Sequence, residues 1–322
     1  MKKSMKMAVL MDSPQDIKPY KDSTVAMLKS AQEMGWACSY FTQHDLVCRD
    51  GAAFATVSSI SINDVHGSDW YNAKSLGEVP LSEFDIILMR KDPPFDMEYI
   101  YSTYALELAE KAGVLVANKP QSLRDANEKF FTLSFPQCCP ETIVSRDMST
   151  LRRFWEKHGQ AVFKPLEGMG GKAVFHVGES GQNLSVILEM LTNGGTITAM
   201  AQTYIPEIVE KGDKRILLID GEPVPYALAR IPKKGELRGN LAAGATGKVV
   251  EITKRDRWIC EQLAPTFKEK GLYFVGIDVI GDYLTEINIT SPTCIQEIAS
   301  ETGIDIAGQL MRSLELAKTK KR

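Results

Sequence analysis

The sequence predicts an α/β protein built from two or three domains, and three observations indicate this. Segments of strand type and of helix type alternate along residues 1–121, as they do in a layered βαβ domain. The alternation starts again after Asn118-Lys119-Pro120, a break typical of a domain boundary. The 322 residues are also enough for more than one hydrophobic core.

The composition is that of an ordinary soluble enzyme, with 44% hydrophobic and 25% charged residues. A net charge of −3 and a pI near 5.9 give no overall attraction to nucleic acid or to an anionic membrane, so we expect neither as a partner. No apolar run approaches about 18 residues and no signal peptide is evident, so we expect a cytoplasmic protein. Without a C-x-x-C motif, the cysteines are expected to be reduced, partly buried thiols. They are Cys38, Cys48, Cys138, Cys139, Cys260 and Cys294.

The N-terminal segment is interpreted as four strands that alternate with two helices. Ser23 is the expected N-cap of the first helix, which stops at Gly35. The second helix runs from Met97 to Lys111. Residues 51–81 are polar and irregular and are assigned to no element. The predicted strands are Met5–Met11, Trp36–Phe41, Phe84–Met89 and Val114–Ala117.

A charged loop follows the third of these strands at its carboxyl end, the edge where open α/β sheets bind ligands. Two prolines stiffen the loop between Arg90 and Asp96. Because Arg90 comes directly after a buried strand, we favour anion binding by this loop. The alternative is a solvated loop in which Asp96 starts the next helix.

The rest of the chain is predicted to form two further units, which gives the division 1–121, 122–202 and 203–322. Ser122 and Asp125 form a predicted capping box for a helix that carries Lys129. Strands and helices then alternate again. The expected elements are strand Glu141–Val144, helix Thr150–His158 and strand Ala161–Lys164.

Two strand-like segments between Val162 and Phe175 are joined by a glycine-rich turn. Without side chains in the turn, backbone N–H groups can approach phosphate oxygens closely. Lys164 beside the turn and Lys129 would supply the positive charge that a triphosphate needs. The turn alone also fits a flexible hairpin, and its spacing is not that of a Walker A loop. The turn glycines are Gly168, Gly170 and Gly171.

The next two strands carry candidate nucleotide contacts. The strand Thr196–Gln202 is suited to an adenine slot, in which backbone groups and Gln202 meet the base edge; the alternative is an ordinary core strand. On the following strand Asp213 and Arg215 share one face. Arg215 is a candidate for stabilising charge on a transferred phosphoryl group.

The strand that ends at Arg230 leads into segment 231–247, which has little periodicity. A loop this long inside a compact domain is either disordered or a functional lid. Its glycines would let it fold over a ligand and carry Arg238 onto that ligand. These glycines are Gly235, Gly239, Gly244 and Gly247.

A hairpin from Val275 to Pro292 carries the predicted metal ligands. The side-chain period of two places Leu284, Glu286 and Asn288 on one face of its second strand. Asp278 on the first strand joins that face only if the turn has an odd number of residues or the hairpin has a bulge, and we expect the odd turn. Two carboxylates and an amide oxygen would then form a site suited to Mg²⁺. The alternative is a polar edge strand that faces water.

Taken together, these stretches resemble the ATP-grasp carboxylate–amine ligases, and among them the bacterial glutathione synthetases. The resemblance spans almost the whole chain. Its most specific stretches are Leu88–Asp96, Asn118–Asp125, Lys164–Gly171, Ala229–Gly244 and Thr285–Cys294. Small departures are Lys172, where a smaller residue is expected, and the Lys233-Lys234 pair in the lid.

The resemblance implies a Rossmann-like N-terminal domain followed by a two-lobed ATP-grasp fold. It implies ATP and Mg²⁺, or Mn²⁺ in its place, as cofactors. The implied nucleotide contacts are Lys129, Lys164, Gly168, Gly170, Gly171, Gln202 and Asp278. The implied metal ligands are Asp278, Glu286 and Asn288. Catalytic roles fall to Arg215, Arg230 and Arg238, and dipeptide binding to Asp12, Arg90, Ser291 and Thr293.

The implied reaction joins γ-glutamylcysteine to glycine through an acyl phosphate, with glutathione, ADP and phosphate as products. Both substrates are small molecules, and the family suggests a homo-oligomer, namely a tetramer. One alternative is another ATP-grasp ligase, of the glutamate or D-alanine type. Others are a nucleotide-binding protein without catalysis and a structural α/β domain, which leaves the coincidence of these groups unexplained.

Overall fold

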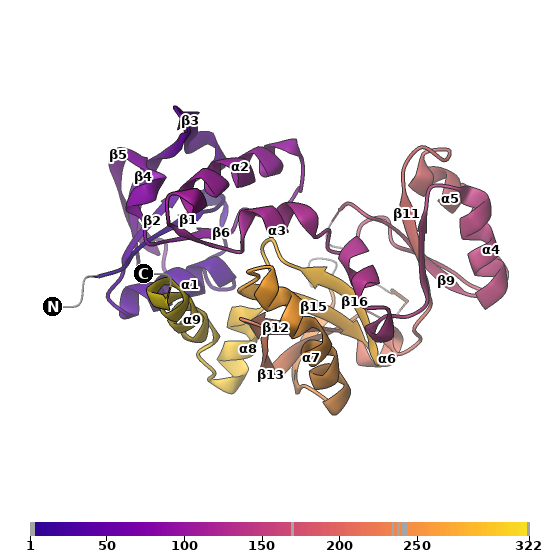
Figure 1. Cartoon of the computed structure of the whole chain (residues 1–322). Helices are drawn as coiled ribbons and strands as arrows, with labels where there is room; N and C mark the ends of the chain where they lie inside the picture. Colours follow the sequence, from indigo (N-terminus) through magenta and orange to yellow (C-terminus); the bar gives the residue numbers. More distant parts are fainter. Residues whose placement is uncertain (1–3, 169–170, 234, 237–238, 240–243, 321–322) are drawn as a thin grey trace.

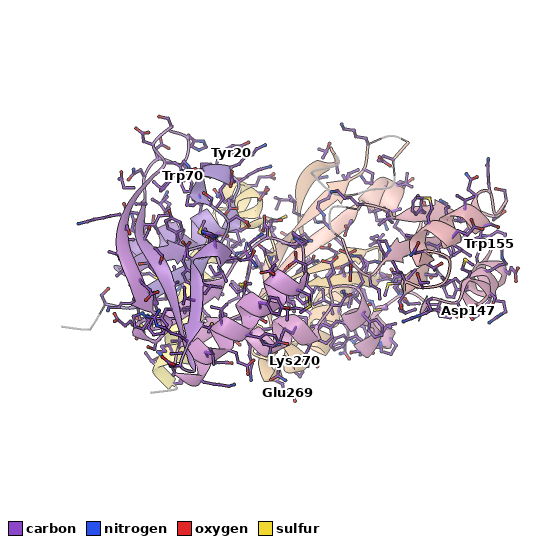
Figure 2. All side chains as sticks on the ribbon, turned by 90° about the horizontal axis from the view of Figure 1, so that it is seen from above. Tyr20, Trp70, Asp147, Trp155, Glu269 and Lys270 are labelled. Carbon is purple, nitrogen blue, oxygen red and sulfur yellow. The ribbon has the colours of Figure 1, made fainter. Side chains whose placement is uncertain are left out.

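The structure is a computed structural model that describes residues 4–168, 171–233, 235–236, 239 and 244–320. Figure 1 shows an elongated molecule in which three β-sheets follow one another, and Figure 2 shows the same elongation from above, with Trp70 near one end and Trp155 near the other. Within the described residues the sheets have seven, five and four strands. The five-stranded sheet lies in the middle.

The N-terminal sheet has the strand order β3-β4-β2-β1-β6-β7, and β5 pairs with β4. Its centre is parallel: β1 pairs with β2 and β6, and β6 pairs with β7. The apolar runs of β1 and β6 are buried, as expected for strands covered on both faces. The strands are β1 Lys6–Leu10, β2 Ala37–Phe41, β3 Leu46–Arg49, β4 Ala52–Ile62, β5 Tyr71–Pro80, β6 Ile86–Met89 and β7 Leu115–Ala117.

The region that had no assignment, residues 51–81, is mostly the long antiparallel hairpin of β4 and β5. In β4, buried residues alternate with less buried ones, and one face packs on the core. In β5 seven of the ten residues are exposed and none is buried. An edge strand with two solvated faces carries no hydrophobic period, which explains why the sequence gives no signal there.

The helices of this region are α1 Ser23–Glu33 and α2 Met97–Lys111, with α2 as predicted. The predicted cap at Ser23 is wrong, because the Asp22 carboxylate accepts the N–H groups of Thr24 and Val25. The Ser23 hydroxyl instead accepts the backbone N–H of Ile295, which ties α1 to the C-terminal part of the chain.

The connection to the next sheet begins with α3 Pro120–Asp125. The predicted capping box is wrong: Ser122 lies inside this helix, and its hydroxyl donates to the Lys270 carbonyl at 2.6 Å. Because the helix ends at Asp125, Lys129 lies beyond it, directly before a short 3₁₀ helix. The 3₁₀ helices are η1 Pro14–Asp16, η2 Gln43–Asp45, η3 Leu81–Glu83, η4 Phe130–Ser134 and η5 Pro136–Cys138.

The four-stranded sheet is antiparallel, with the order β10-β9-β11-β8. Helices α4 and α5 pack against it at the outer end of the molecule (Figure 1). Its hydrophobic cluster is separate from the clusters of the other two sheets. The elements are β8 Thr142–Ser145, α4 Met148–His158, β9 Ala161–Pro165, β10 Phe175–Val177, α5 Leu184–Thr192 and β11 Ala199–Thr203.

The five-stranded sheet is also antiparallel, with the order β14-β13-β12-β15-β16. Its strands are β12 Asp213–Ile219, β13 Glu222–Ile231, β14 Thr246–Glu251, β15 Phe274–Ile280 and β16 Tyr283–Asn288. The helices of this part are α6 Ile208–Lys211, α7 Lys254–Glu269, α8 Ile295–Thr302 and α9 Ile306–Lys320.

The last helix returns to the first sheet. Buried residues of α9 share a hydrophobic cluster with α1 and β1, and Figure 1 shows α9 beside α1. The division of the chain into three units at 121 and 202 stays a prediction. None of the described helices is long and apolar enough to cross a membrane.

The cysteines are free in the structure, as predicted. Cys38, Cys138, Cys260 and Cys294 are buried, and Cys139 is half-buried. Cys48 differs because it is exposed.

Candidate functional site

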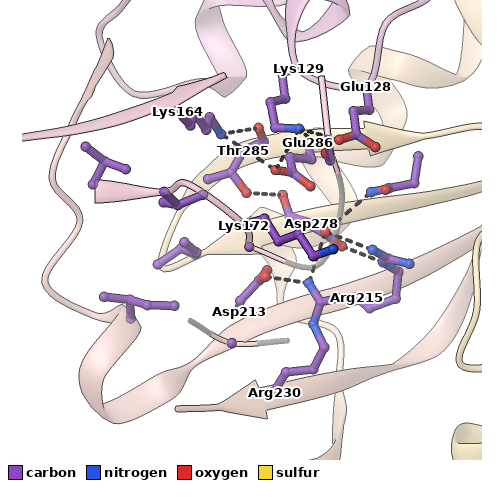
Figure 3. Close-up of a pocket in the computed structure, with 18 of the residues that line it drawn as sticks. Glu128, Lys129, Lys164, Lys172, Asp213, Arg215, Arg230, Asp278, Thr285 and Glu286 are labelled. Carbon is purple, nitrogen blue, oxygen red and sulfur yellow. Dashed lines mark hydrogen bonds and ion pairs between the residues drawn. The ribbon is translucent and has the colours of Figure 1, made fainter. Parts of the chain in front are cut away.

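A cavity of about 580 Å³ lies between the four-stranded and the five-stranded sheets. Strands β9, β10 and β11 supply one side of its lining, and strands β12, β13, β15 and β16 supply the other. Figure 3 shows that charged side chains from both sides point into it. The predicted residues that line it are Lys129, Lys164, Gly168, Gly171, Gln202, Arg215, Arg230, Asp278, Glu286, Asn288, Ser291 and Thr293.

A β-bulge, rather than an odd turn, brings the acidic residues together. The turn between β15 and β16 has two residues, so the expected odd turn is wrong. The pairing shifts between Asp278 and Val279, which leaves Thr285 as the extra residue and sets Asp278 opposite Glu286. Leu284 therefore does not share the face of Glu286 but joins the hydrophobic core.

The Asp278 carboxylate lies between two guanidinium groups. Arg215 donates to both of its oxygens, with Arg215 Nη2 2.9 Å from Asp278 Oδ2. Arg230 Nη2 lies 3.0 Å from the same oxygen. Burial raises the pKa of Asp278, but the two arginines together outweigh it and hold the pKa well below its usual range. Asp278 is therefore ionised at neutral pH.

Asp213 extends this charged group along β12. It accepts a hydrogen bond from Arg230 Nη2, while burial raises its pKa to about 7. Asp213 Oδ1 and Arg230 Nε are buried and have no hydrogen-bond partner among the described residues. Buried polar atoms in native proteins nearly always have a partner, so these two atoms indicate that a ligand or water completes the site.

Two lysines approach Glu286 from the other side of the cavity. Lys129 Nζ lies 4.0 Å and Lys164 Nζ lies 3.9 Å from Glu286 Oε1. Both lysines are at least 95% buried. Burial lowers the pKa of Lys164, whereas for Lys129 the carboxylates of Glu286 and Glu128 outweigh burial and raise the pKa.

The local backbone explains how these lysines are placed. Lys164 lies on β9, one residue before the strand ends at Pro165, and its ammonium donates to the Thr285 carbonyl at the bulge, 3.3 Å away. Lys129 donates to the Gly168 carbonyl at 3.0 Å and contacts Glu128. The backbone N–H of Ile287 also donates to the Glu128 carbonyl, so β16 anchors the Lys129 segment.

The glycine-rich turn lies over the same cavity. Gly168 and Gly171 have φ values of 94° and 72°, in the left-handed region that favours glycine. The turn connects β9 to β10, which pair as antiparallel strands as predicted. Gly170 lies outside the described residues.

Gln202 lines the cavity beside two aromatic rings. It is buried on β11, and its Nε2 donates to Thr142 Oγ1 at 3.1 Å. Beside it, the rings of His176 and Tyr204 also line the cavity and stack with centroids 4.0 Å apart. This part of the lining therefore offers flat aromatic surface next to an amide, which suits a planar base.

The predicted dipeptide residues divide into two groups. Ser291 and Thr293 line the cavity, whereas the described lining includes neither Asp12 nor Arg90. Arg90 is 94% buried and donates to Thr24 Oγ1 and to the Pro292 carbonyl. Asp12 accepts the backbone N–H of Asp92, a cavity residue. Arg90 and Asp12 thus hold two loops that reach the cavity.

The predicted lid is described only in part. Gly235 and Gly239 line the cavity, and Arg238 lies outside the described residues. Ile231 still belongs to β13, and Thr246 and Gly247 already belong to β14, so the irregular segment is shorter than the predicted 231–247.

The donor set on β15 and β16 fits a hard divalent cation. Asp278, Glu286 and Asn288 all line the cavity, and Asn288 Nδ2 donates to Asp278 Oδ2 at 3.3 Å. Carboxylate and amide oxygens are the ligands that Mg²⁺ prefers. Among the described residues, no group of three or more His, Cys, Asp or Glu is placed to hold a metal ion, so an amide oxygen and the substrate's own oxygens would have to complete the set.

Sequence reasoning missed several lining residues. Glu128 precedes a predicted lysine but gives no signal of its own, and His176 and Tyr204 are ordinary aromatic residues in the sequence. Asp213 does carry a signal, since the period of two places it on the same face as Arg215.

Solved structures with similar folds share little sequence with this chain. D-cycloserine synthetase DcsG aligns with 98% of this chain and 100% of its own, with a TM-score of 0.68 and 14% identity. The ATP-grasp ligase PsnB, complexed with a minimal precursor, has a TM-score of 0.63 and 17% identity over 98% of this chain and 100% of its own. D-alanyl-alanine synthetase A from Vibrio cholerae has a TM-score of 0.59 and 11% identity over 98% of this chain and 99% of its own. These similarities show that the chain has an ATP-grasp fold.

Sequence comparisons identify the family within this class. The model of the prokaryotic glutathione synthetase N-terminal domain matches residues 5–124, and that of the ATP-grasp domain matches residues 128–303. The glutathione synthetase of Pseudomonas syringae pv. tomato is 53% identical over 97% of both chains. That of Escherichia coli O6:H1 is 52% identical over 97% of this chain and 98% of its own.

The chain belongs to the prokaryotic glutathione synthetase family. It is an ATP-dependent ligase of glutathione biosynthesis. The predicted fold class, an N-terminal α/β domain followed by an ATP-grasp fold, is confirmed.

Proposed function

We propose that the chain joins the cysteinyl carboxylate of γ-glutamylcysteine to the amine of glycine through an acyl phosphate. A carboxylate oxygen bonds to the γ-phosphorus of ATP as the bond to ADP breaks, and the glycine nitrogen then displaces phosphate from the acyl carbon. The observation that carries this proposal is the convergence of cationic and acidic groups on one cavity of about 580 Å³. These groups belong to Lys129, Lys164, Arg215, Arg230, Asp278 and Glu286.

The nucleotide would lie along the length of the cavity. Gln202 and the neighbouring rings would hold the adenine, and the buried lysines Lys129 and Lys164 would contact the phosphates. The glycine turn, with Gly168, Gly170 and Gly171, would cover those phosphates with backbone N–H groups. The depth of the two ammonium groups supports this, because charge-assisted hydrogen bonds are stronger where water is excluded.

Asp278, Glu286 and Asn288 would hold Mg²⁺ or Mn²⁺. When bound, the cation supplies positive charge that balances the phosphate oxygens. The Asp278 carboxylate already contacts Arg215 and Arg230, so a bound cation would share this carboxylate with the guanidinium groups. The same two arginines would face the transferred phosphoryl group and stabilise its charge.

The acceptor side would use the loops that follow β6 and β16. Ser291 and Thr293 line the cavity and would contact the dipeptide. Asp12 and Arg90 would help to hold it by fixing these loops through Asp92 and the Pro292 carbonyl. Segment 231–247 with Arg238 would close over the reacting atoms, since an acyl phosphate hydrolyses in contact with water.

We also propose a cytoplasmic homo-oligomer, a tetramer by family resemblance, with no nucleic-acid or membrane partner. An exposed apolar row on α2 supports association between copies: Met97, Tyr101 and Tyr104 lie on one face and are each about half exposed. Sedimentation velocity of the purified chain tests the mass, and a monomer at micromolar concentration would contradict this part.

The experiment that tests the function is an ADP-release assay in which each substrate is omitted in turn. We expect ADP and glutathione in equal amounts with ATP, Mg²⁺, γ-glutamylcysteine and glycine, and only background ADP when any of them is missing. Glutamate and D-alanine as alternative substrates form the control. ADP release that depends on D-alanine, and not on γ-glutamylcysteine, would replace the proposed reaction by that of a different ligase.

A further inference from the structure

Among the described residues that line the cavity, Lys172 is a cation to which the proposed reaction gives no task. It follows the glycine turn between β9 and β10 and lines the cavity, although its side chain is exposed. Each of the other lysines and arginines among the described lining residues forms an ion pair, whereas Lys172 forms none. An unpaired ammonium at the wall of a nucleotide cavity is available to a ligand.

The backbone on either side of Lys172 adopts a left-handed conformation. Gly171 and Ala173 have φ values of 72° and 57°, both in the left-handed region. An alanine rarely adopts this conformation, so the turn has a defined and slightly strained shape there. Figure 3 shows the Lys172 side chain directed into the cavity that also holds Asp278 and Arg215.

The other cations of the cavity are already engaged. Arg215 and Arg230 pair with Asp278, and Lys129 and Lys164 lie within 4.0 Å of Glu286. A triphosphate must share these groups with the protein's own carboxylates. Lys172 is in contact with water before a ligand binds. Its contact with a phosphate therefore breaks no ion pair within the protein.

We propose that Lys172 binds the γ-phosphoryl group of ATP and follows it onto the acceptor carboxylate. This rests on the proposed function. The buried lysines lie deep in the cavity and suit the inner phosphates, whereas Lys172 comes from the exposed turn and suits the terminal phosphate. Its ammonium group stays beside the phosphoryl group while the phosphorus exchanges the ADP oxygen for the carboxylate oxygen. Lys172 thus reduces the repulsion between the two anions that must meet.

Binding of nucleotides to the full chain in the presence of Mg²⁺ tests this inference. The probes are ADP and a non-hydrolysable ATP analogue, measured by titration calorimetry. We expect Lys172→Met to lower the affinity for the analogue about fivefold or more and to change the affinity for ADP by less than about twofold, because only the analogue carries the terminal phosphate. Lys172→Arg keeps the charge and is expected to retain most of the affinity for the analogue.

The matched control is Lys29→Met, an exposed lysine on α1 outside the cavity, which should change neither affinity. Equal weakening of ADP and analogue by Lys172→Met would overturn the assignment to the γ-phosphoryl group, and so would an unchanged affinity for the analogue. The experiment needs neither dipeptide nor glycine. Its result therefore stands apart from the ADP-release assay, which alone decides the ligation reaction.

Discussion

Asp278 shows how one side chain can serve two chemical roles. Its carboxylate contacts two arginines in the structure, and the bulge places it opposite Glu286 in the proposed metal site. The arginines keep it ionised and aligned before any ligand arrives. Because a preorganised charge needs no rearrangement at the moment of reaction, this contact favours the proposed phosphoryl transfer.

A pH prediction follows from Asp213, whose pKa burial raises to about 7. A carboxyl group with a raised pKa in the folded state binds more protons there than in the unfolded chain, where its pKa is about 3.9. Its contribution to the free energy of unfolding is complete below the unfolded pKa and is lost as the pH rises through the folded pKa. We therefore expect the stability of the wild type relative to Asp213→Asn to fall between about pH 4 and pH 7.

Urea unfolding of both proteins at pH 5, 6, 7 and 8 measures this difference. Asp16→Asn, a change of an exposed aspartate near the N-terminus, is the matched control and should keep a constant difference from the wild type. The assignment would be contradicted if the free energy of unfolding of the wild type, relative to that of Asp213→Asn, increased with rising pH.

Site residues that belong to a sequence motif could be predicted. Site residues that reach the cavity only through contacts with distant parts of the chain could not. Lys129, Lys164 and Glu286 belong to recognisable stretches and lie in the cavity. Glu128 and His176 lie there because β16 and Tyr204 are beside them in space, and no local pattern in the sequence encodes such a contact.

The β15–β16 hairpin carries the main lesson at the level of elements. Period-two alternation predicted the faces of Glu286 and Asn288, but a strict alternation also placed Leu284 with them. The extra residue, Thr285, reverses the alternation at one point, so Leu284 packs in the core while Glu286 faces the cavity. The sequence shows that a bulge or an odd turn is needed and does not show which, because both satisfy the same pattern.

Gly276 on β15 provides a prediction at this scale. A Cβ at this position would lie 2.9 Å from Arg215 Cδ and 2.9 Å from Pro292 Cβ. Gly276→Ala should therefore displace the arginine that holds Asp278 and the loop that carries Ser291. We expect the free energy of unfolding to fall by about 1–3 kcal/mol, the usual cost of overpacking in a dense core. We also expect kcat to fall at least about tenfold, because a small displacement of a catalytic group slows the reaction.

Thermal unfolding and the ADP-release assay measure the two effects. Gly67→Ala is the control: it lies between β4 and β5, where the nearest atom would be 3.4 Å from the new Cβ. Wild-type activity and stability in Gly276→Ala would show that Arg215 can leave its position without consequence.

At the level of the whole molecule, the N-terminal and five-stranded sheets share their hydrophobic clusters, while the four-stranded sheet has its own. The cavity lies at the boundary of these two bodies. The alternation of strands and helices predicted the layered architecture correctly. It did not predict that α9 returns to α1, since an amphipathic helix shows that it has an apolar face and not which partner covers it.

This return makes the C-terminal helix part of the N-terminal core. Leu314 on α9 is fully buried in the cluster with α1 and β1. We expect Leu314→Ala to lower the free energy of unfolding by about 2–4 kcal/mol, the usual range for a buried leucine. Leu316→Ala is the matched control on the same helix, because Leu316 is 61% exposed. Urea unfolding measures both, and equal stability of the two variants would contradict the packing of α9.

The account depends most on the acidic pair that the bulge sets opposite each other. Its most direct test is ADP release by Asp278→Asn and Glu286→Gln, with ATP, Mg²⁺, γ-glutamylcysteine and glycine present and folding checked by circular dichroism. We predict loss of nearly all turnover in both variants, while Cys294→Ala, which changes a buried thiol at the same cavity, keeps much of it. Normal turnover in the two carboxylate variants would contradict the proposed metal site and the mechanism built on it.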